Sequence, residues 1–350
     1  MIKVAINGYG RIGRIAHRVI LERFSDQVEI VAINGGNSTD ITGWAYLLKY
    51  DTAYGQLKGH TISGLPTPEN TTVPKKVGDL VVDEKKVPFF SEKNPEVLPW
   101  KQLGVEVVIE CTGHLLTEEK VKTHLTAGAA KVVLSAPAKD SVIKTYVLDV
   151  NLEETGRASE SIVSNASCTT NCVAPVAQIM VSKFGVYKAM MTTMHAYTSD
   201  QRLQDGGHKD YRRARAAASN IVPTTTGAAK AATETVPELK GLFTGMAIRV
   251  PVIVGSLSDF TFHLKRNTTV PEVNQVLKEE AESVRYKHIL EVTTDPLVSS
   301  DIIGNPHSAI VDLGLTQVVG GDMVKIFAWY DNEWGYVNRL VEEVVLIGQK

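Results

Sequence analysis

The chain opens with IKVAINGYGRIG (residues 2–13), and this stretch decides the fold of its first half. Apolar residues alternate over residues 2–6, which is the pattern of a β-strand. Gly8, Gly10 and Gly13 follow at the spacing G-x-G-x-x-G, and a helical pattern begins directly after them. Such glycines permit a tight turn, the close approach of a pyrophosphate and close packing of the helix on the strand. We therefore predict a dinucleotide-binding βαβ unit, with a glycine-rich turn that binds no ligand as the alternative.

A second apolar strand is predicted over residues 29–34 and ends in NGGNST, residues 34–39. In dinucleotide-binding units an acidic residue usually stands at this tip and accepts hydrogen bonds from the adenosine ribose. The first carboxylate here is Asp40, which lies too far along the chain. Because no negative charge at the tip repels a 2′-phosphate, we expect the polar side chains of residues 37–39 to donate hydrogen bonds to one. A plain turn that binds no phosphate is the alternative.

Two further apolar strands are predicted over residues 105–109 and 131–134. Small or polar residues follow each strand, and Thr112 and Ser135 stand among them. Ligands of open parallel sheets bind beyond the carboxyl ends of the strands, so both hydroxyls are candidate cofactor contacts. Residues 55–99 are rich in Pro, Gly, Thr and Lys, which indicates loops and a short antiparallel excursion.

Length and composition narrow the class of protein. A chain of 350 residues favours two domains. The net charge of -2 provides no general attraction to nucleic acid or to an anionic membrane. No apolar run approaches the roughly 20 residues that span a bilayer, and no signal-peptide pattern precedes the first strand, so we expect a cytoplasmic protein. Cys111, Cys168 and Cys172 are too few for a disulfide framework and lack the spacing of a four-ligand zinc site, so no metal site is expected.

The second half is organised around ASCTTNC, residues 166–172. Apolar residues at helical spacing follow this stretch, which puts Cys168 at a predicted helix N-terminus. Unpaired backbone N–H groups and the helix dipole favour a thiolate there, so we expect Cys168 to be more nucleophilic than an ordinary cysteine and Cys172 to be buried and unreactive. The alternative is that Ser167 caps the helix and Cys168 is a small buried apolar residue. Pro175 conflicts with the predicted helix because it has no N–H for the second turn.

Other candidate site residues follow in the second half. His195 closes a predicted strand and is either a general base for the thiol or a structural histidine. Arg249 lies in an apolar run and needs a partner, either a substrate anion or a structural carboxylate. Thr226 and Gly227 precede a helical stretch that offers a second anion site. Basic residues gather over residues 209–215, where interface ion pairs are favoured over phosphate or nucleic acid.

The remaining periodicity completes the expected fold. Alternation over residues 256–264 and 324–329 predicts a largely antiparallel sheet, and residues 337–345 predict a final amphipathic helix. We therefore expect an α/β chain in which a Rossmann dinucleotide-binding domain is followed by an α+β catalytic domain with a mostly antiparallel sheet.

Six motifs, in this order, resemble the phosphorylating glyceraldehyde-3-phosphate dehydrogenase family along essentially the whole chain. They are INGYGRIGR (6–14), SNASCTTNC (164–172), HAYTSDQ (195–201), HKDYRRARAAA (208–218), PTTTGAAKA (223–231) and YDNEWGY (330–336). The resemblance implies a Rossmann domain formed by residues 1–167 and 332–350, a catalytic domain formed by residues 168–331, and usually a homotetramer. No membrane is expected as a partner, and no nucleic acid is required.

The resemblance also implies a reaction. Cys168 would attack the aldehyde of glyceraldehyde 3-phosphate while His195 takes the proton. Hydride would pass to the nicotinamide, and inorganic phosphate would attack the resulting thioester to release 1,3-bisphosphoglycerate. The backbone N–H of Cys168 and the imidazole would stabilise the oxyanion. The substrate phosphate would be held by Thr198 and Arg249, and the attacking phosphate by Ser167, Thr169, Thr226 and Gly227.

The resemblance implies a dinucleotide held by Gly8, Gly10, Arg11, Ile12, Gly13, Asn34, Gly35, Lys93, Thr112, Ser135 and Asn332. The chain departs from the NAD-using members around the adenosine, where they commonly have Asn-Asp and this chain has Asn34-Gly35. The small residues Gly206-Gly207 and the basic Lys93 resemble members that accept NADP. We therefore predict NADP use, either preferred or alongside NAD. The alternative is that backbone and water satisfy the ribose of NAD unaided.

Two other functions remain open at this point. Erythrose-4-phosphate dehydrogenase is a relative that uses the same cysteine and histidine but hydrolyses its thioester; the intact HAYT and TTTG motifs favour the phosphorylating reaction. A non-catalytic role at RNA or protein is supported only weakly, because the net charge is slightly negative and no aromatic-rich basic patch is visible. NADP use would suit a biosynthetic or gluconeogenic direction.

Overall fold

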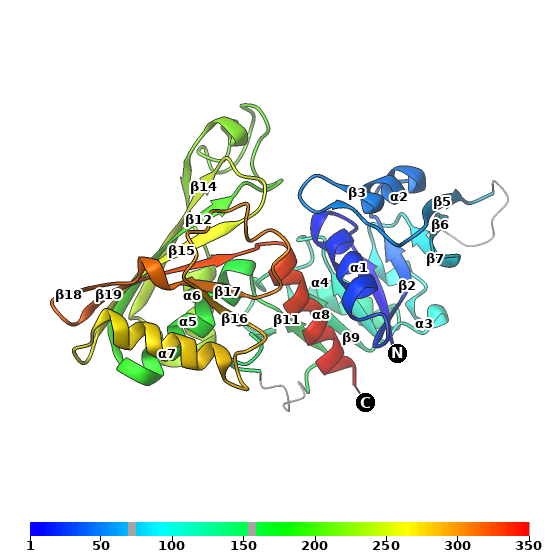
Figure 1. Ribbon diagram of the computed structural model, residues 1–350. Coiled ribbons are helices and arrows are strands. Elements are labelled where there is room, and N and C mark those ends of the chain that lie inside the picture. The colour runs from blue at the N-terminus through cyan, green and yellow to red at the C-terminus, as the bar shows by residue number, and fades with distance from the viewer. Residues whose placement is uncertain (69–74, 153–158, 350) are drawn as a thin grey trace. The chain divides into compact units, whose positions relative to one another are not determined.

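The computed structural model describes residues 1–68, 75–152 and 159–349, which fold into two compact units (Figure 1). Within the described residues, the first unit is drawn from Met1–Thr145, Glu154–Asn165 and Val337–Lys350, and the second from Tyr146–Glu153 and Ala166–Tyr336.

The bounds of these units differ from the predicted domain bounds in three places. Residues 146–152, 166–167 and 332–336 belong to the second unit, whereas the sequence analysis assigns them to the first domain. The first of these segments is held to the second unit by Arg285, which donates to the carbonyl oxygens of Asp149 at 2.6 Å and Val150 at 3.0 Å.

A nine-stranded sheet forms the centre of the first unit. In spatial order its strands are β10 (Lys144–Thr145), β11 (Ile162–Ser164), β9 (Lys131–Leu134), β8 (Val107–Glu110), β1 (Ile2–Asn7), β2 (Val28–Asn34), β7 (Lys85–Phe90), β6 (Lys76–Val82) and β5 (Ile62–Pro66). Neighbours are parallel from β10 to β7, whereas β7, β6 and β5 form the antiparallel excursion that the sequence predicts. The chain leaves β1 first for β2 on one side and later for β8 on the other, and such a switch point is where doubly wound sheets bind ligands.

Helices cover both faces of this sheet (Figure 1). The helices and short elements are α1 (Arg11–Arg23), α2 (Ile41–Lys49), the β3 (Tyr50–Asp51) and β4 (Gly55–Gln56) hairpin, η1 (Pro95–Val97), α3 (Trp100–Leu103), α4 (Glu118–Thr126) and the later turns of α8 (Trp334–Gly348). Trp100 of α3 and Val121 of α4 share one buried cluster with Ala5 of β1. Gly13 of α1 lies against Ile6, whose side chain points to the opposite face. Both faces of β1 are therefore buried, as its nearly continuous apolar sequence requires.

The final helix returns to the first unit. Its apolar stripe is fully or almost fully buried and consists of Val337, Leu340, Val341, Val344 and Val345. Arg23 of α1 donates a hydrogen bond to Asn338, and the Lys131 ammonium donates to the carbonyl oxygen of Ile347 at 2.7 Å. The amphipathic helix predicted from the sequence is confirmed.

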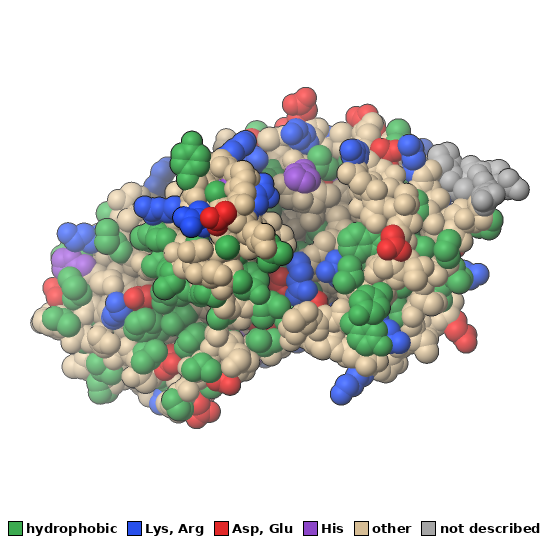
Figure 2. Space-filling model, turned by 90° about the horizontal axis from the view of Figure 1, so that it is seen from above, with side chains coloured by type: hydrophobic (Ala, Val, Ile, Leu, Met, Phe, Trp, Pro, Cys, Tyr) green, Lys and Arg blue, Asp and Glu red, His purple; other side chains and the backbone are tan. Residues whose placement is uncertain are grey.

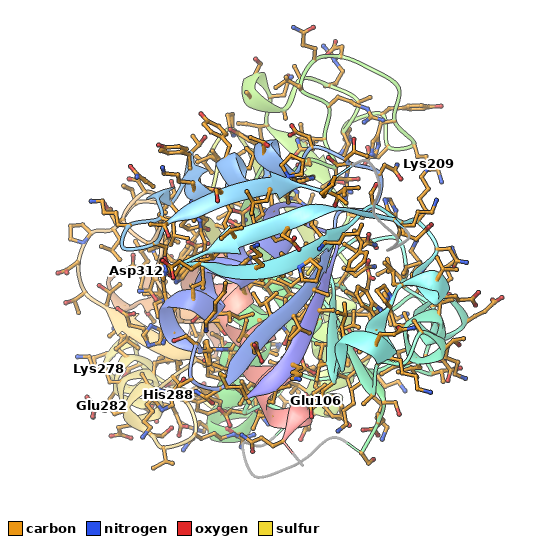
Figure 3. All side chains as sticks on the ribbon, turned by 90° about the vertical axis from the view of Figure 1, so that its right-hand side faces the viewer. Glu106, Lys209, Lys278, Glu282, His288 and Asp312 are labelled. Atoms are coloured by element: carbon orange, nitrogen blue, oxygen red, sulfur yellow. The ribbon has the colours of Figure 1, made fainter. Side chains whose placement is uncertain are left out.

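The strands of the first unit have distinct polar contacts at their two ends. At the amino-terminal end, the backbone N–H of Lys3 donates to the carboxylate of Glu106 at 3.0 Å, and Figure 3 labels Glu106 at this end of the sheet. The contacts at the carboxyl end surround the candidate cofactor pocket described below.

A second sheet forms the centre of the second unit. Its strands in spatial order are β13 (Val222–Thr224), β14 (Phe243–Val250), β12 (Val186–Ala196), β15 (Ser256–Leu264), β19 (Met323–Tyr330), β17 (Ala309–Asp312) and β16 (Leu290–Thr293), with β18 (Gln317–Val319) paired to β19. Five pairs are antiparallel, and only β12–β14 and β16–β17 are parallel among the described strands. The predicted mostly antiparallel sheet is confirmed.

Helices of the second unit lie on one side of its sheet (Figure 1). They are α5 (Cys168–Phe184), α6 (Ala228–Thr235) and α7 (Val270–Glu282), and the short turns are η2 (Ala217–Ser219), η3 (Pro237–Leu239) and η4 (Leu313–Leu315). α5 packs against β12, β15, β17 and β19. On the covered face the inward residues of β15 alternate with half-buried ones, and its Phe260 and Phe262 rings stack at 5.8 Å.

The predicted conflict at Pro175 is wrong, because α5 runs through it from Cys168 to Phe184. Its neighbours Val173, Val176 and Met180 are completely buried. Burying each such side chain contributes about 1.5–3 kcal/mol, whereas an interior proline costs about 3 kcal/mol. Tertiary packing therefore outweighs the lost hydrogen bond.

Charges are mixed over the surface. On the face shown in Figure 2, Lys and Arg side chains are interspersed with Asp and Glu side chains, in keeping with the net charge of -2. Within the described ranges, every helix is too short or too polar to span a bilayer.

His17 of α1 is 2 % exposed, and its Nδ1 lies 2.7 Å from the hydroxyl of Tyr9. Burial lowers the pKa of His17 to about 3, and nearby His60 acts in the same direction. Burial also raises the pKa of Tyr9. The pair is therefore neutral over the physiological range.

His17 makes stability depend on acid. Below pH 6.5 the unfolded chain protonates this histidine and the folded chain does not until about pH 3, so the free energy of unfolding falls as the pH falls through this window. The slope from this one group approaches about 1.4 kcal/mol per pH unit. We expect His17→Gln, which keeps a polar partner for Tyr9, to show a smaller slope between pH 6 and 4 in urea unfolding. Equal slopes for the two proteins would contradict the assignment.

Candidate active site

A pocket opens at the carboxyl ends of β1, β2 and β8, at the switch point of the first sheet. Its lining combines Asn7, Gly8, Tyr9, Gly10, Asn34, Gly35, Gly36, Asn37, Ser38, Trp44, Glu92, Lys93, Cys111, Thr112, His114 and Leu115. Six of the predicted cofactor residues meet here, namely Gly8, Gly10, Asn34, Gly35, Lys93 and Thr112. The sequence analysis did not single out Tyr9, Trp44, Glu92, His114 or Leu115, because their position at the pocket depends on loops and on α2.

Two of the three motif glycines have a steric reason, and the third leaves open space. Gly8 has a φ of +94°, and a Cβ there would lie 2.7 Å from the backbone of Cys111 and Thr112. A Cβ at Gly13 would lie 2.2 Å from the carbonyl oxygen of Gly8. By contrast, no described atom lies within 4 Å of a Cβ at Gly10, so the backbone is open toward the pocket. Gly10 is also the N-cap of α1, so the uncapped helix N-terminus fits a dinucleotide pyrophosphate.

A buried carboxylate holds the floor of this pocket. Glu110 ends β8 and is 2 % exposed. It accepts hydrogen bonds from the Asn7 amide at 2.5 Å, from the backbone N–H of Thr112 at 2.8 Å, and from the Thr112 hydroxyl. His124 Nε2 lies 3.0 Å from the same carboxylate, and Trp100 Nε1 donates to His124 Nδ1 at 3.0 Å. The Trp100 bond requires a bare Nδ1, so Nε2 carries the proton and donates to Glu110.

Asn34 extends this network to the neighbouring strand. Its amide donates to the side-chain oxygen of Asn7 at 2.7 Å and to the carbonyl oxygen of Glu92 at 2.8 Å. Its oxygen accepts from the backbone N–H of Glu92 at 3.0 Å. Asn34 therefore joins the ends of β1 and β2 to the loop that carries Lys93. Its side chain is engaged in positioning the pocket.

Other predicted cofactor residues lie outside the pocket lining. The guanidinium of Arg11 forms an ion pair with Asp51 at 2.5 Å. Ile12 and Ser135 are likewise outside the lining. Asn332 belongs to the second unit, where its side-chain oxygen accepts from the backbone N–H of Gly255 and from the Ser256 hydroxyl.

Asp40 has a structural role. Its carboxylate accepts a hydrogen bond from the backbone N–H of Gly43 at 2.8 Å and caps the N-terminus of α2. This agrees with the expectation that Asp40 stands too far along the chain to serve the β2 tip.

The second candidate centre lies at the start of α5. Ser167 is the N-cap, and its hydroxyl oxygen accepts from the backbone N–H of Thr170 at 3.1 Å. The capping alternative for Ser167 is therefore what the structure shows. Cys168 is the first residue of the helix, as the sequence predicts, and it is only partly buried.

His195, the last residue but one of β12, faces this thiol. Its Nε2 lies 3.4 Å from Cys168 Sγ. Its Nδ1 lies 2.7 Å from the carbonyl oxygen of Ala196 and 2.8 Å from Nη1 of Arg249. Arg249 stands directly opposite His195 in the β12–β14 register and also donates to Ala196 O at 2.9 Å. The tautomer that donates from Nδ1 to Ala196 leaves Nε2 free to accept the thiol proton.

The expected lowering of the thiol pKa is wrong. Burial raises the pKa of Cys168, while Arg249 and hydrogen bonds involving Thr169 and the backbone act in the opposite direction. Burial also lowers the pKa of His195 to about 3, and Arg249 lowers it further. A helix dipole contributes about 0.3–1 kcal/mol, which desolvation exceeds here. The pair is therefore a neutral thiol beside a neutral imidazole.

Tyr330 is a buried neighbour that the sequence analysis missed. Its hydroxyl bonds with Thr169 at 3.0 Å and with Thr193 at 2.8 Å, and its ring lies edge-on to the imidazole of His195 at 6.0 Å. Burial raises the pKa of Tyr330, so it stays neutral. The sequence marked it only as the first residue of the YDNEWGY motif, directly after a predicted strand.

The remaining predicted substrate residues lie on loops of the same unit. Thr198 follows the end of β12, and Gly227 is the N-cap of α6, with the Thr226 hydroxyl accepting from the N–H of Ala228 at 3.1 Å. Arg213 donates to the Thr224 hydroxyl and to the carbonyl oxygen of Thr225, so the predicted basic segment is tied to this turn.

The other two cysteines differ in burial, since Cys111 is partly buried in the first unit and Cys172 is buried in the second. Cys172 is completely buried beneath β19, and burial raises its pKa, as expected for the unreactive neighbour. Burial raises the pKa of Cys111 to about 12. In the described ranges, His, Cys, Asp and Glu side chains form no group of three that could hold a metal ion.

Comparison with known proteins decides the family. Residues 2–118 match the model of the glyceraldehyde 3-phosphate dehydrogenase NAD binding domain, and residues 167–332 match that of its C-terminal domain. The chain belongs to the glyceraldehyde 3-phosphate dehydrogenase family. It is 49 % identical to the glyceraldehyde-3-phosphate dehydrogenase of Streptomyces coelicolor over 352 aligned positions, with 100 % of this chain and 99 % of that protein covered. The corresponding protein of Mycobacterium tuberculosis is 49 % identical with 99 % of each chain covered, and that of Zymomonas mobilis 47 % with 97 %.

Membership of the glyceraldehyde 3-phosphate dehydrogenase family identifies the first unit as an NAD-binding Rossmann domain and the second unit as the catalytic domain. The protein is an oxidoreductase of glycolysis that oxidises glyceraldehyde 3-phosphate with NAD. The open backbone at Gly10 and the close packing at Gly8 and Gly13 fit this cofactor.

The Glu110 network provides a test of the candidate cofactor pocket. Glu110→Gln places an amide NH₂ group against donors from Asn7, Thr112 and His124, so buried hydrogen bonds are lost. We expect the free energy of unfolding to fall by about 3 kcal/mol, with weaker NAD binding in calorimetry because the turns at the pocket loosen.

The matched control is Glu106→Gln at the opposite end of the same strand, where the carboxylate accepts from Lys3 near solvent. That variant should change stability by less than about 1 kcal/mol and leave NAD affinity unchanged. Similar losses in both variants would show that the buried network has no special role.

Proposed function

We propose that this family member is a phosphorylating dehydrogenase, which converts glyceraldehyde 3-phosphate and inorganic phosphate to 1,3-bisphosphoglycerate through a thioester on Cys168. The observation that carries the proposal is the 3.4 Å approach of His195 Nε2 to Cys168 Sγ at the start of α5. A nucleophile within hydrogen-bond reach of a base is the arrangement that covalent catalysis requires.

The proposed attack begins from the neutral pair. Sγ of Cys168 forms a bond to the aldehyde carbon while Nε2 of His195 takes the thiol proton, which gives a thiohemiacetal. The backbone N–H groups at the start of α5 stabilise the oxygen that becomes negative. The bound nicotinamide supplies the hydride acceptor, and loss of hydride leaves the acyl group on Cys168 as a thioester. An oxygen of inorganic phosphate then attacks the acyl carbon, the C–S bond breaks, and the thiolate recovers its proton.

Arg249 has two proposed roles in this reaction. Its Nε is buried and has no hydrogen-bond partner among the described residues, which suits a substrate phosphate. With that phosphate bound, the guanidinium charge that lowers the pKa of His195 is compensated. Substrate binding would thereby make the base stronger at the step where it is used.

The attacking inorganic phosphate is assigned to residues at the N-termini of α5 and α6. Thr226 and Gly227 stand at the N-terminus of α6, and Ser167 and Thr169 stand at that of α5. Two helix N-termini with hydroxyl side chains are suited to a phosphate that attacks the thioester. Thr198 joins Arg249 in holding the substrate.

At the adenosine end we propose that NADP is accepted as well as NAD. Asn37, Ser38 and Lys93 line one pocket, and Gly35 stands where an acidic residue would otherwise contact the ribose. The nearby carboxylate of Glu92 is engaged by the backbone N–H groups of Lys93 and Asn94, and these hydrogen bonds lower its pKa. A cation with neutral donors favours a 2′-phosphate.

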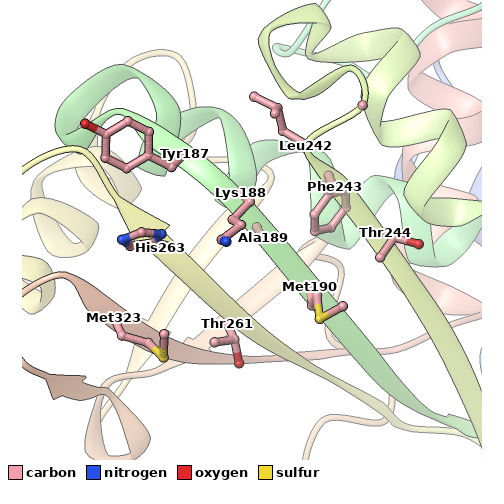
Figure 4. Close-up of a pocket in the computed structure, with 11 residues that line it drawn as sticks. Tyr187, Lys188, Ala189, Met190, Leu242, Phe243, Thr244, Thr261, His263 and Met323 are labelled. Carbon is pink, nitrogen blue, oxygen red and sulfur yellow. The ribbon is translucent and has the colours of Figure 1, made fainter.

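We also propose a homotetramer. Figure 4 shows a groove on the face of the second sheet opposite α5, with Tyr187, Met190 and Met323 among its lining residues. These three side chains are 54 %, 65 % and 46 % exposed in the single chain. A contiguous apolar face of this kind is typical of a subunit interface.

Substitution of the two cysteines of α5 tests the mechanism. Cys168→Ser should lower kcat by at least about a thousandfold, because the hydroxyl is a far weaker nucleophile beside a base of such low pKa. Cys172→Ser, four residues on in the same helix, should retain kcat within about threefold. Activity of Cys168→Ser near that of the unmodified protein would overturn the thioester proposal.

Arg249→Gln tests the substrate phosphate site. We expect the KM for glyceraldehyde 3-phosphate to rise about 10–100-fold, the loss of one charge-assisted contact, while the KM for NAD stays within about twofold. Steady-state kinetics with each reactant varied separately make the measurement. An unchanged KM for the aldehyde would assign Arg249 to a structural role.

Paired cofactor kinetics, with and without inorganic phosphate, test the remaining proposals. We expect NADP to support turnover with kcat/KM within about a hundredfold of NAD, and turnover to require phosphate. A preference for NAD of at least about a hundredfold would overturn NADP use. A rate independent of phosphate would instead favour the hydrolytic erythrose-4-phosphate dehydrogenase reaction.

A further inference from the structure

An aromatic cluster lies under the adenosine end of the cofactor pocket. Tyr9 from the β1–α1 turn, Trp44 from α2 and Phe89 from β7 meet there, and Tyr9 and Phe89 are almost completely buried. The Tyr9 ring is edge-on to Phe89 at 5.6 Å and to Trp44 at 5.8 Å, and Trp44 stacks on Phe89 at 6.3 Å. The guanidinium of Arg14 lies over Trp44 at 5.4 Å. The ring of Phe89 is therefore held in place from several elements.

Gly35 rests directly on this cluster. A Cβ at position 35 would lie 2.6 Å and 2.7 Å from Cε1 and Cζ of Phe89, and 3.4 Å from Nε1 of Trp44. The backbone at this position is tied to β7, because the N–H of Gly35 donates to the carbonyl oxygen of Phe90 at 2.9 Å. Gly35 does not have the positive φ that would itself require glycine. The obstacle to a side chain at position 35 is the ring of Phe89.

The next residue, Gly36, is limited in the opposite way. Its φ is +74°, which favours glycine, yet no described atom lies within 4 Å of a Cβ built there. A side chain at position 36 meets strain in the backbone and not a clash with the cluster. Substitutions at the two adjacent glycines therefore distinguish a clash with the Phe89 ring, at position 35, from backbone strain, at position 36.

We propose that Phe89 determines cofactor choice by excluding a side chain, and hence a carboxylate, from position 35. This inference rests on the proposed use of NADP. Position 35 is the tip of β2, from which an acidic residue reads the ribose hydroxyls and repels a 2′-phosphate. Because Phe89 lies beneath position 35, a single substitution cannot introduce an acidic residue there. The pocket therefore stays open to a 2′-phosphate beside Asn37, Ser38 and Lys93. Phe89 touches no cofactor itself and acts as a positioning residue.

Phe89→Val removes the ring atoms that block position 35 and keeps a β-branched residue suited to a strand. It also leaves Trp44 Nε1, a buried donor with no partner among the described residues, near the new side chain. A carboxylate introduced by Gly35→Asp could then be accommodated with a donor beside it. This predicts that the two substitutions are coupled.

The experiment compares the unmodified chain, Gly35→Asp, Phe89→Val and the double variant by thermal unfolding and by kcat/KM for NAD and NADP. We expect Gly35→Asp to lower Tm and to weaken use of both cofactors, and Phe89→Val to lower Tm without changing the NADP/NAD ratio by more than about threefold. The double variant should recover at least half of the Tm lost by Gly35→Asp and shift the ratio toward NAD by at least about tenfold.

Gly36→Asp is the matched control, since Phe89→Val should not rescue it. Additive Tm losses in the Gly35/Phe89 double variant, or a switch toward NAD in Gly35→Asp alone at unchanged Tm, would overturn the role of Phe89 while NADP use by the unmodified chain stands. A preference of the unmodified chain for NAD of at least about a hundredfold would overturn NADP use and the role of Phe89 in cofactor choice together, whatever the Tm coupling.

Discussion

The buried carboxylate of Glu110 is the interaction on which the first unit depends. Parallel strands that end side by side leave backbone and side-chain donors at one edge of the sheet, and an unpaired buried donor is costly. Glu110 accepts from Asn7 at the end of β1, from Thr112 beyond β8 and from His124 on α4. Asn34 carries the network on to β2. The same bonds that satisfy this edge therefore also set the walls of the candidate cofactor pocket.

In the second unit the charged group beside the buried polar residues is a cation, the guanidinium of Arg249. Arg249 on β14 and His195 on β12 are adjacent in the parallel register; His195 is buried and Arg249 is partly buried. Burial and, secondarily, the cation of Arg249 lower the pKa of His195 and keep it neutral, and burial raises the pKa of the Cys168 thiol and keeps it protonated. Without substrate, the imidazole and the thiol are thus both neutral. A substrate anion bound at Arg249 is suited to raise the pKa of His195.

Pattern-based reasoning succeeded where one local rule governs. The G-x-G-x-x-G turn, the helix that starts at Cys168 and the amphipathic α8 each follow from periodicity and turn chemistry over a few residues. It failed where neighbours distant in sequence compete with the local rule. Pro175 stays helical because buried packing outweighs its missing hydrogen bond, and the Cys168 pKa rises because burial outweighs the helix dipole.

The sequence by itself determined the two-part fold, the glycine-rich dinucleotide turn and the pairing of Cys168 with His195 as candidates for one reaction. Only the tertiary structure decided the partners: Arg249 beside His195, Arg11 on Asp51, Asp40 on the N-terminus of α2, and Phe89 beneath Gly35. The physical reason is range. Backbone preference and periodicity act over a few residues and can be read along the chain. Burial, close contact and hydrogen bonding depend on which surfaces folding brings together.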